Sequence, residues 1–178
     1  FRFAVAPDAV ERGSAWATNQ AWMAHFTLTD TANGRFHAAE RLGRGALGIA
    51  GSDALPFRVW LDDWQAAGRA SQSGLFPLRL EAEQGPVAIE LELTAVKPLA
   101  LQGQDGWDRR GPEPGNASYY YSFTRLAAQG RLHIGSASFE VEGTAWMDRE
   151  WSSNALGEDL EGWDWISLHL SDGSELML

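Results

Sequence analysis

The residues of this chain that could do chemistry are concentrated between Trp146 and Trp151, where Asp148 and Glu150 lie two positions apart. Side chains alternate across a β-strand, so Trp146, Asp148 and Glu150 would share one face. A carboxyl group beside an aromatic wall can keep its proton to an unusually high pH and then act as a general acid. The same pattern is also typical of an ordinary solvent-facing strand.

An acid of this kind could protonate an alkene, because aromatic faces stabilise the resulting carbocation. Water would then add, and Asp148 or Glu150 would accept its proton. The aromatic side chains available for such a lining are those of Tyr119, Tyr121, Trp146, Trp163 and Trp165. The competing interpretation is structural, with both carboxylates on the surface or paired with Arg149 or Arg125.

Two neighbouring segments add candidate residues for the same site. Tyr119 and Tyr121 flank Tyr120, so they would share one strand face while Tyr120 takes the other. Trp163 and Trp165 share a face as well, which lines either a ligand cavity or the core. Exposed on the surface, these two rings would instead suit carbohydrate.

His25 and Trp151 complete the set of candidate ligand-binding residues. His25 shares its strand face with Asn19 and Thr27, which indicates either a polar patch or a structural histidine. Trp151 falls on the face opposite Asp148.

Composition excludes several classes of function. The net charge of −10 and the lack of a basic stretch argue against binding to nucleic acid. The chain has no cysteine, which removes disulfides and thiolate chemistry. It carries no phosphate-binding loop, serine-hydrolase elbow, HExxH helix or EF-hand loop. Nine tryptophans indicate a large aromatic core or a cavity for a hydrophobic small molecule. No cofactor and no metal are required.

These residues must be positioned by strands, because alternating segments separated by turn signals run through the whole chain. We expect about nine or ten antiparallel strands, little helix and a lipocalin-like barrel. The expected strands cover residues 1–5, 14–28, 35–42, 56–60, 76–82, 87–95, 119–126, 131–134, 139–151, 163–170 and 175–178. Residues 43–54 and 97–117 are expected to be loops, and Gly130 is expected to form a turn.

Several long segments together carry a family likeness. They are 19–26 (NQAWMAHF), 56–64 (PFRVWLDDW), 116–126 (NASYYYSFTRL), 143–153 (GTAWMDREWSS) and 162–165 (GWDW), in this order. The chain resembles the AttH-like family, which is related to the carotenoid hydratases that hydrate an isoprenoid double bond. The resemblance implies two lipocalin-like barrels in tandem and a bacterial, periplasmic or secreted protein. Predicted hydrolases, hydratases and attachment-related proteins are all described in this family.

The resemblance also bears on individual residues. The proposed proton donor of carotenoid hydratases is an aspartate whose motif matches Trp146, Met147 and Asp148, which makes Asp148 the implied acid. Those hydratases carry tyrosine where Trp146 stands, and histidine and tryptophan near Tyr119 and Tyr121.

From these observations we expect a domain over residues 1–160 and the start of a second similar domain over 161–178. Both ends read as strands, so we expect a segment of a longer protein. The expected ligand is an isoprenoid- or lipid-like molecule, bound by a hydratase, a hydrolase or a non-catalytic carrier or envelope-associated protein. Contact with a membrane and the oligomeric state stay open.

Overall fold

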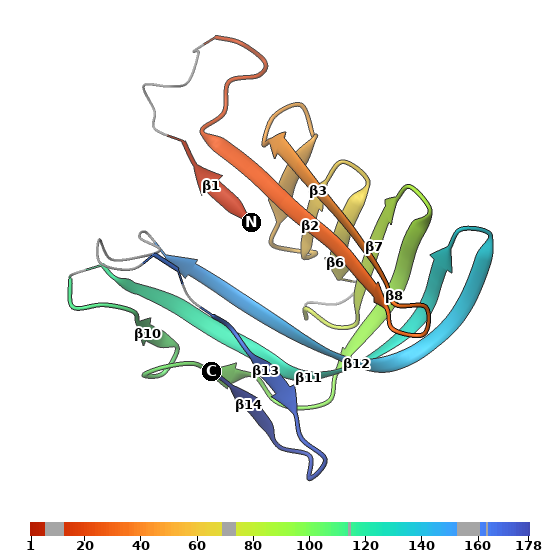
Figure 1. Ribbon diagram of the computed structural model, residues 1–178. Coiled ribbons are helices and arrows are strands. Elements are labelled where there is room, and N and C mark those ends of the chain that lie inside the picture. Colours follow the sequence, from red (N-terminus) through yellow and green to blue (C-terminus); the bar gives the residue numbers. More distant parts are fainter. Residues whose placement is uncertain (6–12, 69–73, 114, 153–160, 163) are drawn as a thin grey trace. The chain divides into compact units, whose positions relative to one another are not determined.

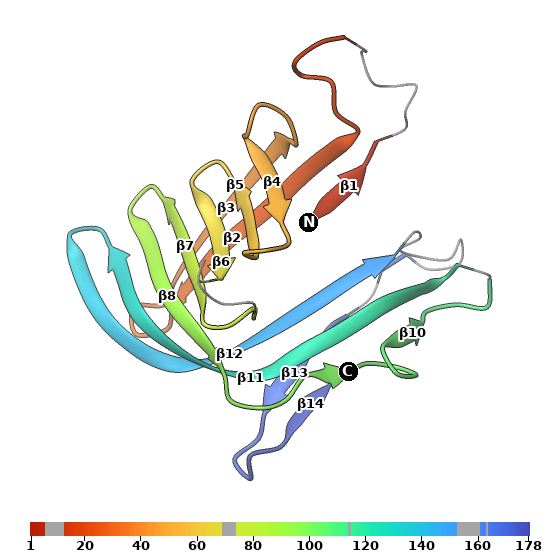
Figure 2. The same ribbon diagram turned by 180° about the vertical axis from the view of Figure 1, so that it is seen from behind.

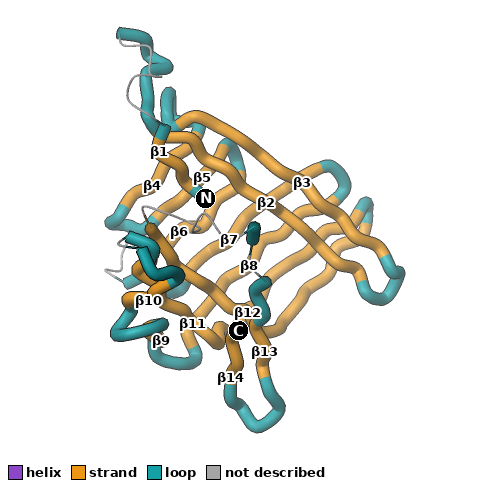
Figure 3. Tube along the Cα trace, turned by 60° about the vertical axis from the view of Figure 1, so that its left-hand side comes forward, coloured by secondary structure: helices purple, strands orange, loops and turns teal. Residues whose placement is uncertain are grey.

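The structure, a computed structural model, describes residues 1–5, 13–68, 74–113, 115–152, 161–162 and 164–178. Every regular element in these residues is a β-strand (Figures 1 and 3), which confirms the predicted all-β fold. None of these residues belongs to a helix that could cross a membrane. Contacts divide the chain into a first unit, Phe1–Leu93 with Gln129–Glu142, and a second unit, Thr94–Ala128 with Gly143–Leu178.

The first unit is built from two layers of antiparallel strands. One layer is the sheet β1-β2-β3, with β1 (Arg2–Ala4), β2 (Gln20–Asp30) and β3 (Arg35–Arg44). The other layer has β4 (Ala50–Asp53), β5 (Arg58–Leu61), β6 (Trp64–Gly68), β7 (Leu78–Gln84) and β8 (Val87–Ala95), each paired with the next. Strands β4 to β6 lie in front of β2 and β3 in Figure 2.

Apolar residues at alternate positions of β2 hold the two layers of the first unit together. Trp22 packs with Ala50 of β4 and Leu61 of β5. Phe26 packs with Trp64 of β6 and Val87 of β8. The Phe26 and Trp64 rings meet edge to face at 5.7 Å. The expected alternation of β2 therefore becomes one inward, core-facing side of the β2–β3 hairpin.

Turn residues fix this hairpin. Asp30 accepts hydrogen bonds from the backbone N–H of Asn33 at 3.1 Å and from its side-chain amide at 2.7 Å. Gly34 adopts a positive φ of 62°, a conformation in which glycine has no steric cost. The turn predicted at residues 30–34 is therefore confirmed, and it sets the register in which Phe26 faces Ala39.

The second unit contains the short strands β9 (Ala100–Leu101) and β10 (Trp107–Arg109), which both pair with β11 (Ala117–Ile134). Strand β12 (Ala137–Ser152) also pairs with β11, and the two strands continue into the first unit. Strands β13 (Ser167–His169) and β14 (Glu175–Met177) form the hairpin predicted around residues 171–174.

Three local predictions were wrong. Residues 43–54 include the end of β3 and all of β4, and residues 97–117 include β9 and β10. In both segments, glycine and proline punctuation hid short strands: β4 pairs with β5, and β9 and β10 pair with β11. Gly130 is not a turn: β11 runs straight through it and the turn comes at Gly135.

The pairings between described strands form three sheets, and the lipocalin-like barrel and its tandem partner stay predictions. The domain boundary near residue 160 also stays a prediction, because residues 153–160 lie outside the described residues.

Gly130 allows a close approach of two backbones within the first unit. A Cβ atom at this position would lie 2.0 Å from the carbonyl oxygen of Glu90, and the φ angle of 151° disfavours other residues. We expect Gly130→Ala to lower the free energy of unfolding by about 3 kcal/mol in urea denaturation. The matched control is Gly143→Ala, where a Cβ would meet no atom within 4 Å. A loss below that of the control would contradict this account.

Candidate functional site

The buried face of β11 carries polar side chains at alternate positions. Ser118, Tyr120 and Ser122 have exposed fractions of 1%, 4% and 0%, and Asn116 just before the strand is also buried. Buried polar groups need hydrogen-bond partners, so this face must meet polar groups from other elements. The partners come from β12, from the segments on either side of β10, and from the β13–β14 hairpin.

Asp148 of β12 lies against this face. Its Oδ1 atom accepts a hydrogen bond from the Ser122 hydroxyl at 2.5 Å and another from the Trp146 indole N–H at 2.8 Å. The Ser122 oxygen in turn accepts a hydrogen bond from the side-chain amide of Gln102 at 2.9 Å. We call Gln102, Tyr120, Ser122, Trp146 and Asp148 the Asp148 cluster. The expected shared face of Trp146 and Asp148 is present.

Tyr120 is the tyrosine of the cluster. Burial raises its pKa to about 12, although the Trp165 N–H at 3.3 Å opposes this shift. The negative charge of Asp148 contributes to this same rise. The phenol O–H also donates to the Met177 sulfur at 3.2 Å. Tyr120 therefore stays a neutral phenol throughout the physiological pH range.

Glu150 has a separate partner on the same side of the sheet. Arg110 forms an ion pair with Glu150 at 2.8 Å and donates through Nε to the Ser118 hydroxyl at 3.1 Å. Its guanidinium also lies 5.7 Å from the centre of the Tyr120 ring. The expected salt-bridged alternative thus describes Glu150, with Arg110 in place of Arg149 or Arg125.

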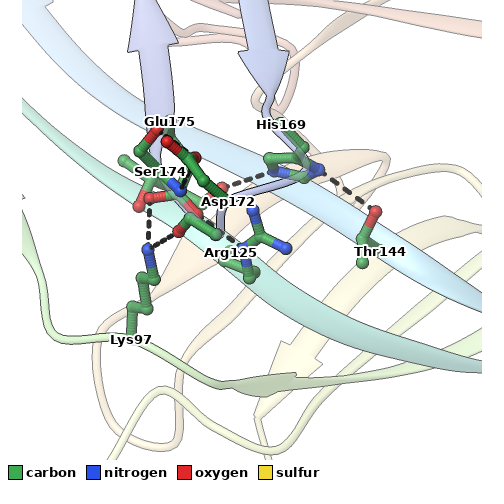
Figure 4. A network of polar contacts seen from close by, with 9 residues as sticks. Lys97, Arg125, Thr144, His169, Asp172, Ser174 and Glu175 are labelled. Atoms are coloured by element: carbon green, nitrogen blue, oxygen red, sulfur yellow. Dashed lines mark hydrogen bonds and ion pairs between the residues drawn. The ribbon is translucent and has the colours of Figure 1, made fainter.

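The β13–β14 hairpin covers part of the cluster. The Trp165 and Trp146 rings meet edge to face at 6.4 Å, and the His169 ring lies 5.9 Å from that of Trp146. His169 is held by the carbonyl oxygen of Thr124 at 2.7 Å and the hydroxyl of Thr144 at 3.1 Å (Figure 4). Of the tryptophans expected as a lining, Trp146 contacts the carboxyl and Trp165 packs against Trp146.

A charged network fastens the same hairpin to β11. Glu175 has a side chain that is only 10% exposed, and it pairs with Arg125 at 2.5 Å and Lys97 at 2.7 Å (Figure 4). These two cations hold the pKa of the Glu175 carboxyl below its usual value. Because the carboxylate is charged and paired, it anchors the hairpin that carries Met177 and His169 on either side of the turn.

Tyr119 and Tyr121 lie on the opposite face of β11 from the Asp148 cluster. Tyr119 is 58% exposed and stacks on Trp151 at 5.9 Å, and Tyr121 meets the edge of the same ring. Tyr120, rather than either neighbour, is beside Asp148. The expectation that Tyr119 and Tyr121 line the Asp148 carboxyl was therefore wrong, because the register of β11 against β12 turns the even-numbered residues toward it.

Of the remaining sequence candidates, His25 does not join the cluster. His25 belongs to the first unit, where its ring pairs with Glu40 at 2.8 Å in an exposed position. Trp163 lies outside the described residues. Sequence reasoning missed Ser122, Gln102 and Arg110. The alternation of Ser118, Tyr120 and Ser122 along β11 was the only signal for a polar inner face.

Among the described residues, no group of three or more histidine, aspartate or glutamate side chains is placed to hold a metal ion. The cluster instead offers a carboxyl fixed by two donors, a neutral phenol and the indole ring of Trp146, against which the Trp165 ring packs. Such a set can exchange a proton with a substrate and can stabilise positive charge on carbon.

The family described as AttH-like matches residues 1–178 of this chain. A candidate AttH from Nitrosomonas europaea is 36% identical with a TM-score of 0.83, over 93% of this chain and 50% of that one. Kievitone hydratase from Nectria haematococca is 12% identical with a TM-score of 0.59, over 89% of this chain and 54% of that one. That second likeness shows the fold alone. The chain spans about half the length of both proteins, and no curated protein matches it.

The raised pKa of Tyr120 predicts a specific loss of stability in alkali. An unfolded tyrosine ionises near pH 10 and the folded Tyr120 near pH 12. Between these values the phenol loses its proton more readily in the unfolded chain, so rising pH favours unfolding. We expect the free energy of unfolding to fall across this interval, and to fall less in Tyr120→Phe. Urea denaturation at a series of pH values measures this. The exposed Tyr119→Phe variant should behave as the wild type, and equal pH dependence in all three would contradict the assignment.

Proposed function

The chain belongs to the AttH-like family, and from that membership and the Asp148 cluster we propose that it binds a hydrophobic, isoprenoid- or lipid-like molecule and adds water to one of its double bonds. The observation that carries this proposal is the position of the Asp148 carboxyl. It is held by the Trp146 indole, and Trp146 in turn packs against Trp165. A proton donor beside aromatic faces is the arrangement that acid-catalysed hydration needs.

In the proposed reaction, the protonated Asp148 carboxyl gives its proton to one carbon of the double bond. The π electrons form the new C–H bond, and the other carbon becomes a carbocation beside the indole rings. Water then adds to that carbon, and the proton it releases returns to the Asp148 carboxylate. Ser122 and Trp146 both donate to Oδ1, so the transferable proton belongs on Oδ2.

Two neighbours support this assignment of roles. Tyr120 stays a neutral phenol because its pKa is about 12, so it can position the carboxyl or the incoming water by hydrogen bonding. Glu150 is paired with Arg110, so we assign the proton transfer to Asp148. Glu150 could still accept a proton from water in place of Asp148.

Kievitone hydratase shares the fold of this chain, and its activity supports hydration as the proposed class of reaction. Hydrolysis of a lipid-like substrate is the alternative reaction in this proposal. A lipocalin-like barrel around the ligand, a second similar barrel, and a bacterial, periplasmic or secreted location belong to the same proposal. Asp148 matches the proposed proton donor of the carotenoid hydratases, but the residues around it differ from theirs.

A non-catalytic carrier or envelope-associated binding protein is the second candidate. It is favoured by the hydrogen bonds that Asp148 already makes, because a carboxyl with two internal donors can serve the fold alone. Both candidates require that a hydrophobic molecule binds. Only hydration requires that Asp148 transfers a proton.

The experiment incubates the protein with geranylgeraniol or lycopene in ¹⁸O-labelled water and follows the label by mass spectrometry. We expect a product that has gained one labelled water. Asp148→Asn should lower the rate of its formation by roughly a hundredfold or more, because a neutral amide cannot donate the proton. Binding of the same molecules, followed by tryptophan fluorescence, should change little.

The matched control is Asp172→Asn, in the turn between β13 and β14. Asp172 accepts hydrogen bonds from Ser174, and asparagine can make similar ones, so this variant should keep the wild-type rate. Equal labelling by Asp148→Asn and the wild type would remove Asp148 from the mechanism. Binding without labelling in the wild type would favour the carrier.

A further inference from the structure

The Asp148 carboxyl is linked to Gln102 through the hydroxyl of Ser122. The side-chain amide of Gln102 donates to the Ser122 oxygen at 2.9 Å, and the Ser122 hydroxyl donates to Oδ1 of Asp148 at 2.5 Å. Ser122 has an exposed fraction of 0%, so its hydroxyl depends on protein groups for its partners. All three residues belong to the second unit. We call this series of hydrogen bonds the Gln102–Ser122–Asp148 network.

Trp146 sets the direction of this network at its Asp148 end. Its indole N–H donates to the same Oδ1 atom at 2.8 Å, and an indole nitrogen can only donate. An oxygen that accepts two hydrogen bonds is the carbonyl oxygen of a protonated carboxyl, which leaves the proton on Oδ2. The Ser122 hydroxyl has a single proton and spends it on Oδ1. Its oxygen then has only lone pairs left, and these match the amide N–H of Gln102.

The backbone of Gln102 is fixed beside Ser122 by its own hydrogen bonds. Gln102 directly follows β9, and its N–H donates to the carbonyl oxygen of Tyr120 on β11 at 3.1 Å. Its carbonyl oxygen accepts from the N–H of Gly106 at 2.9 Å. Gly106 in turn accepts from the N–H of Tyr120 at 2.8 Å. The amide that points at Ser122 is therefore positioned before a substrate arrives.

We propose that Gln102 is a positioning residue for proton transfer by Asp148. Its amide directs the Ser122 hydroxyl onto Oδ1, and Oδ2 remains the oxygen that gives the proton. This inference rests on the proposed function, and it concerns a residue that acts through Ser122 without touching the substrate.

The network contributes most while the proton is leaving. The Oδ2–H bond breaks and its electron pair stays on the carboxyl, while the π electrons of the substrate bind the proton as a new C–H bond. Negative charge then spreads onto Oδ1, where Ser122 and Trp146 donate. Hydrogen bonds to an ionised oxygen are roughly twice as strong as those to a neutral one. The later return of a proton from water to Oδ2 restores the acid.

Interactions that strengthen only in the transition state raise the rate of reaction without tightening the binding of substrate. A donor behind the Ser122 hydroxyl polarises it and strengthens its own donation to Asp148. Loss of the Gln102 amide should therefore lower kcat and leave the affinity for the substrate unchanged.

Two substitutions separate this role from a structural one. Gln102→Leu removes the donor and keeps a similar size. Gln102→Glu keeps the shape but presents an acceptor, which draws the Ser122 hydroxyl away from Asp148. With geranylgeraniol in ¹⁸O-labelled water, we expect kcat to fall roughly threefold in Gln102→Leu and roughly thirtyfold in Gln102→Glu. The Kd for geranylgeraniol, followed by tryptophan fluorescence, should stay unchanged in both variants. A structural role predicts the opposite order, because glutamate can still hydrogen-bond to Ser122 and leucine cannot.

The matched control is Gln104→Glu, which makes the same change two residues further along, where the side chain is exposed. The backbone of Gln104 pairs with that of Trp107, and this substitution leaves that pairing intact. We expect the control to keep the wild-type kcat.

A measurement on the wild type needs neither a variant nor a substrate. The Ser122 hydroxyl proton and the Trp146 indole proton both point at Oδ1, so they lie close together. We expect a nuclear Overhauser cross-peak between them in protein that carries ¹³C-labelled serine and ¹⁵N-labelled tryptophan. The cross-peak should persist in Gln104→Glu and disappear in Gln102→Glu.

Three results would overturn the proposal. One is the absence of the cross-peak in the wild type, because the hydroxyl would then point away from Oδ1. Another is a larger loss of kcat in Gln102→Leu than in Gln102→Glu. The third is a cross-peak that persists in Gln102→Glu. If the wild type forms no labelled product, the proposed function fails, and the cross-peak with its loss in Gln102→Glu still decides whether Gln102 directs the hydroxyl.

Discussion

The hydrogen bond between Ser122 and Asp148 is the contact around which the second unit is arranged. Ser122 is fully buried on β11, so its hydroxyl must be satisfied from within the protein. It reaches Asp148 on β12 and Gln102 beside β9, and it thereby joins three segments that are distant in sequence. The even-numbered face of β11 turns inward as a result, which buries Tyr120 and leaves Tyr119 exposed.

Strand periodicity was sufficient to predict most of the fold. The alternation of β2 and β8 reflects burial of one face, and the Asn33–Gly34 turn follows from backbone sterics, so local sequence determines both. Gly130 shows where this reasoning ends. Glycine signals a turn when judged locally, but here it is required by the approach of the Glu90 backbone, a contact that only the folded chain contains.

The candidate site was predictable in part for the same reason. Alternation within β12 placed Trp146 and Asp148 together, because both residues belong to one strand. The identity of the neighbouring tyrosine depended on the register between β11 and β12, which alternation within a single strand does not contain. Arg110, Gln102 and the β13–β14 hairpin arrive from loops and distant segments, and no spacing in the sequence connects them to Asp148.

The hydrogen bonds that Asp148 makes within the protein bear on its proposed role. Asp148 already receives two hydrogen bonds, so a substrate gains little by binding to Oδ1 and must meet the carboxyl at Oδ2. A fixed carboxyl favours reaction over affinity, because its geometry is set before the substrate arrives.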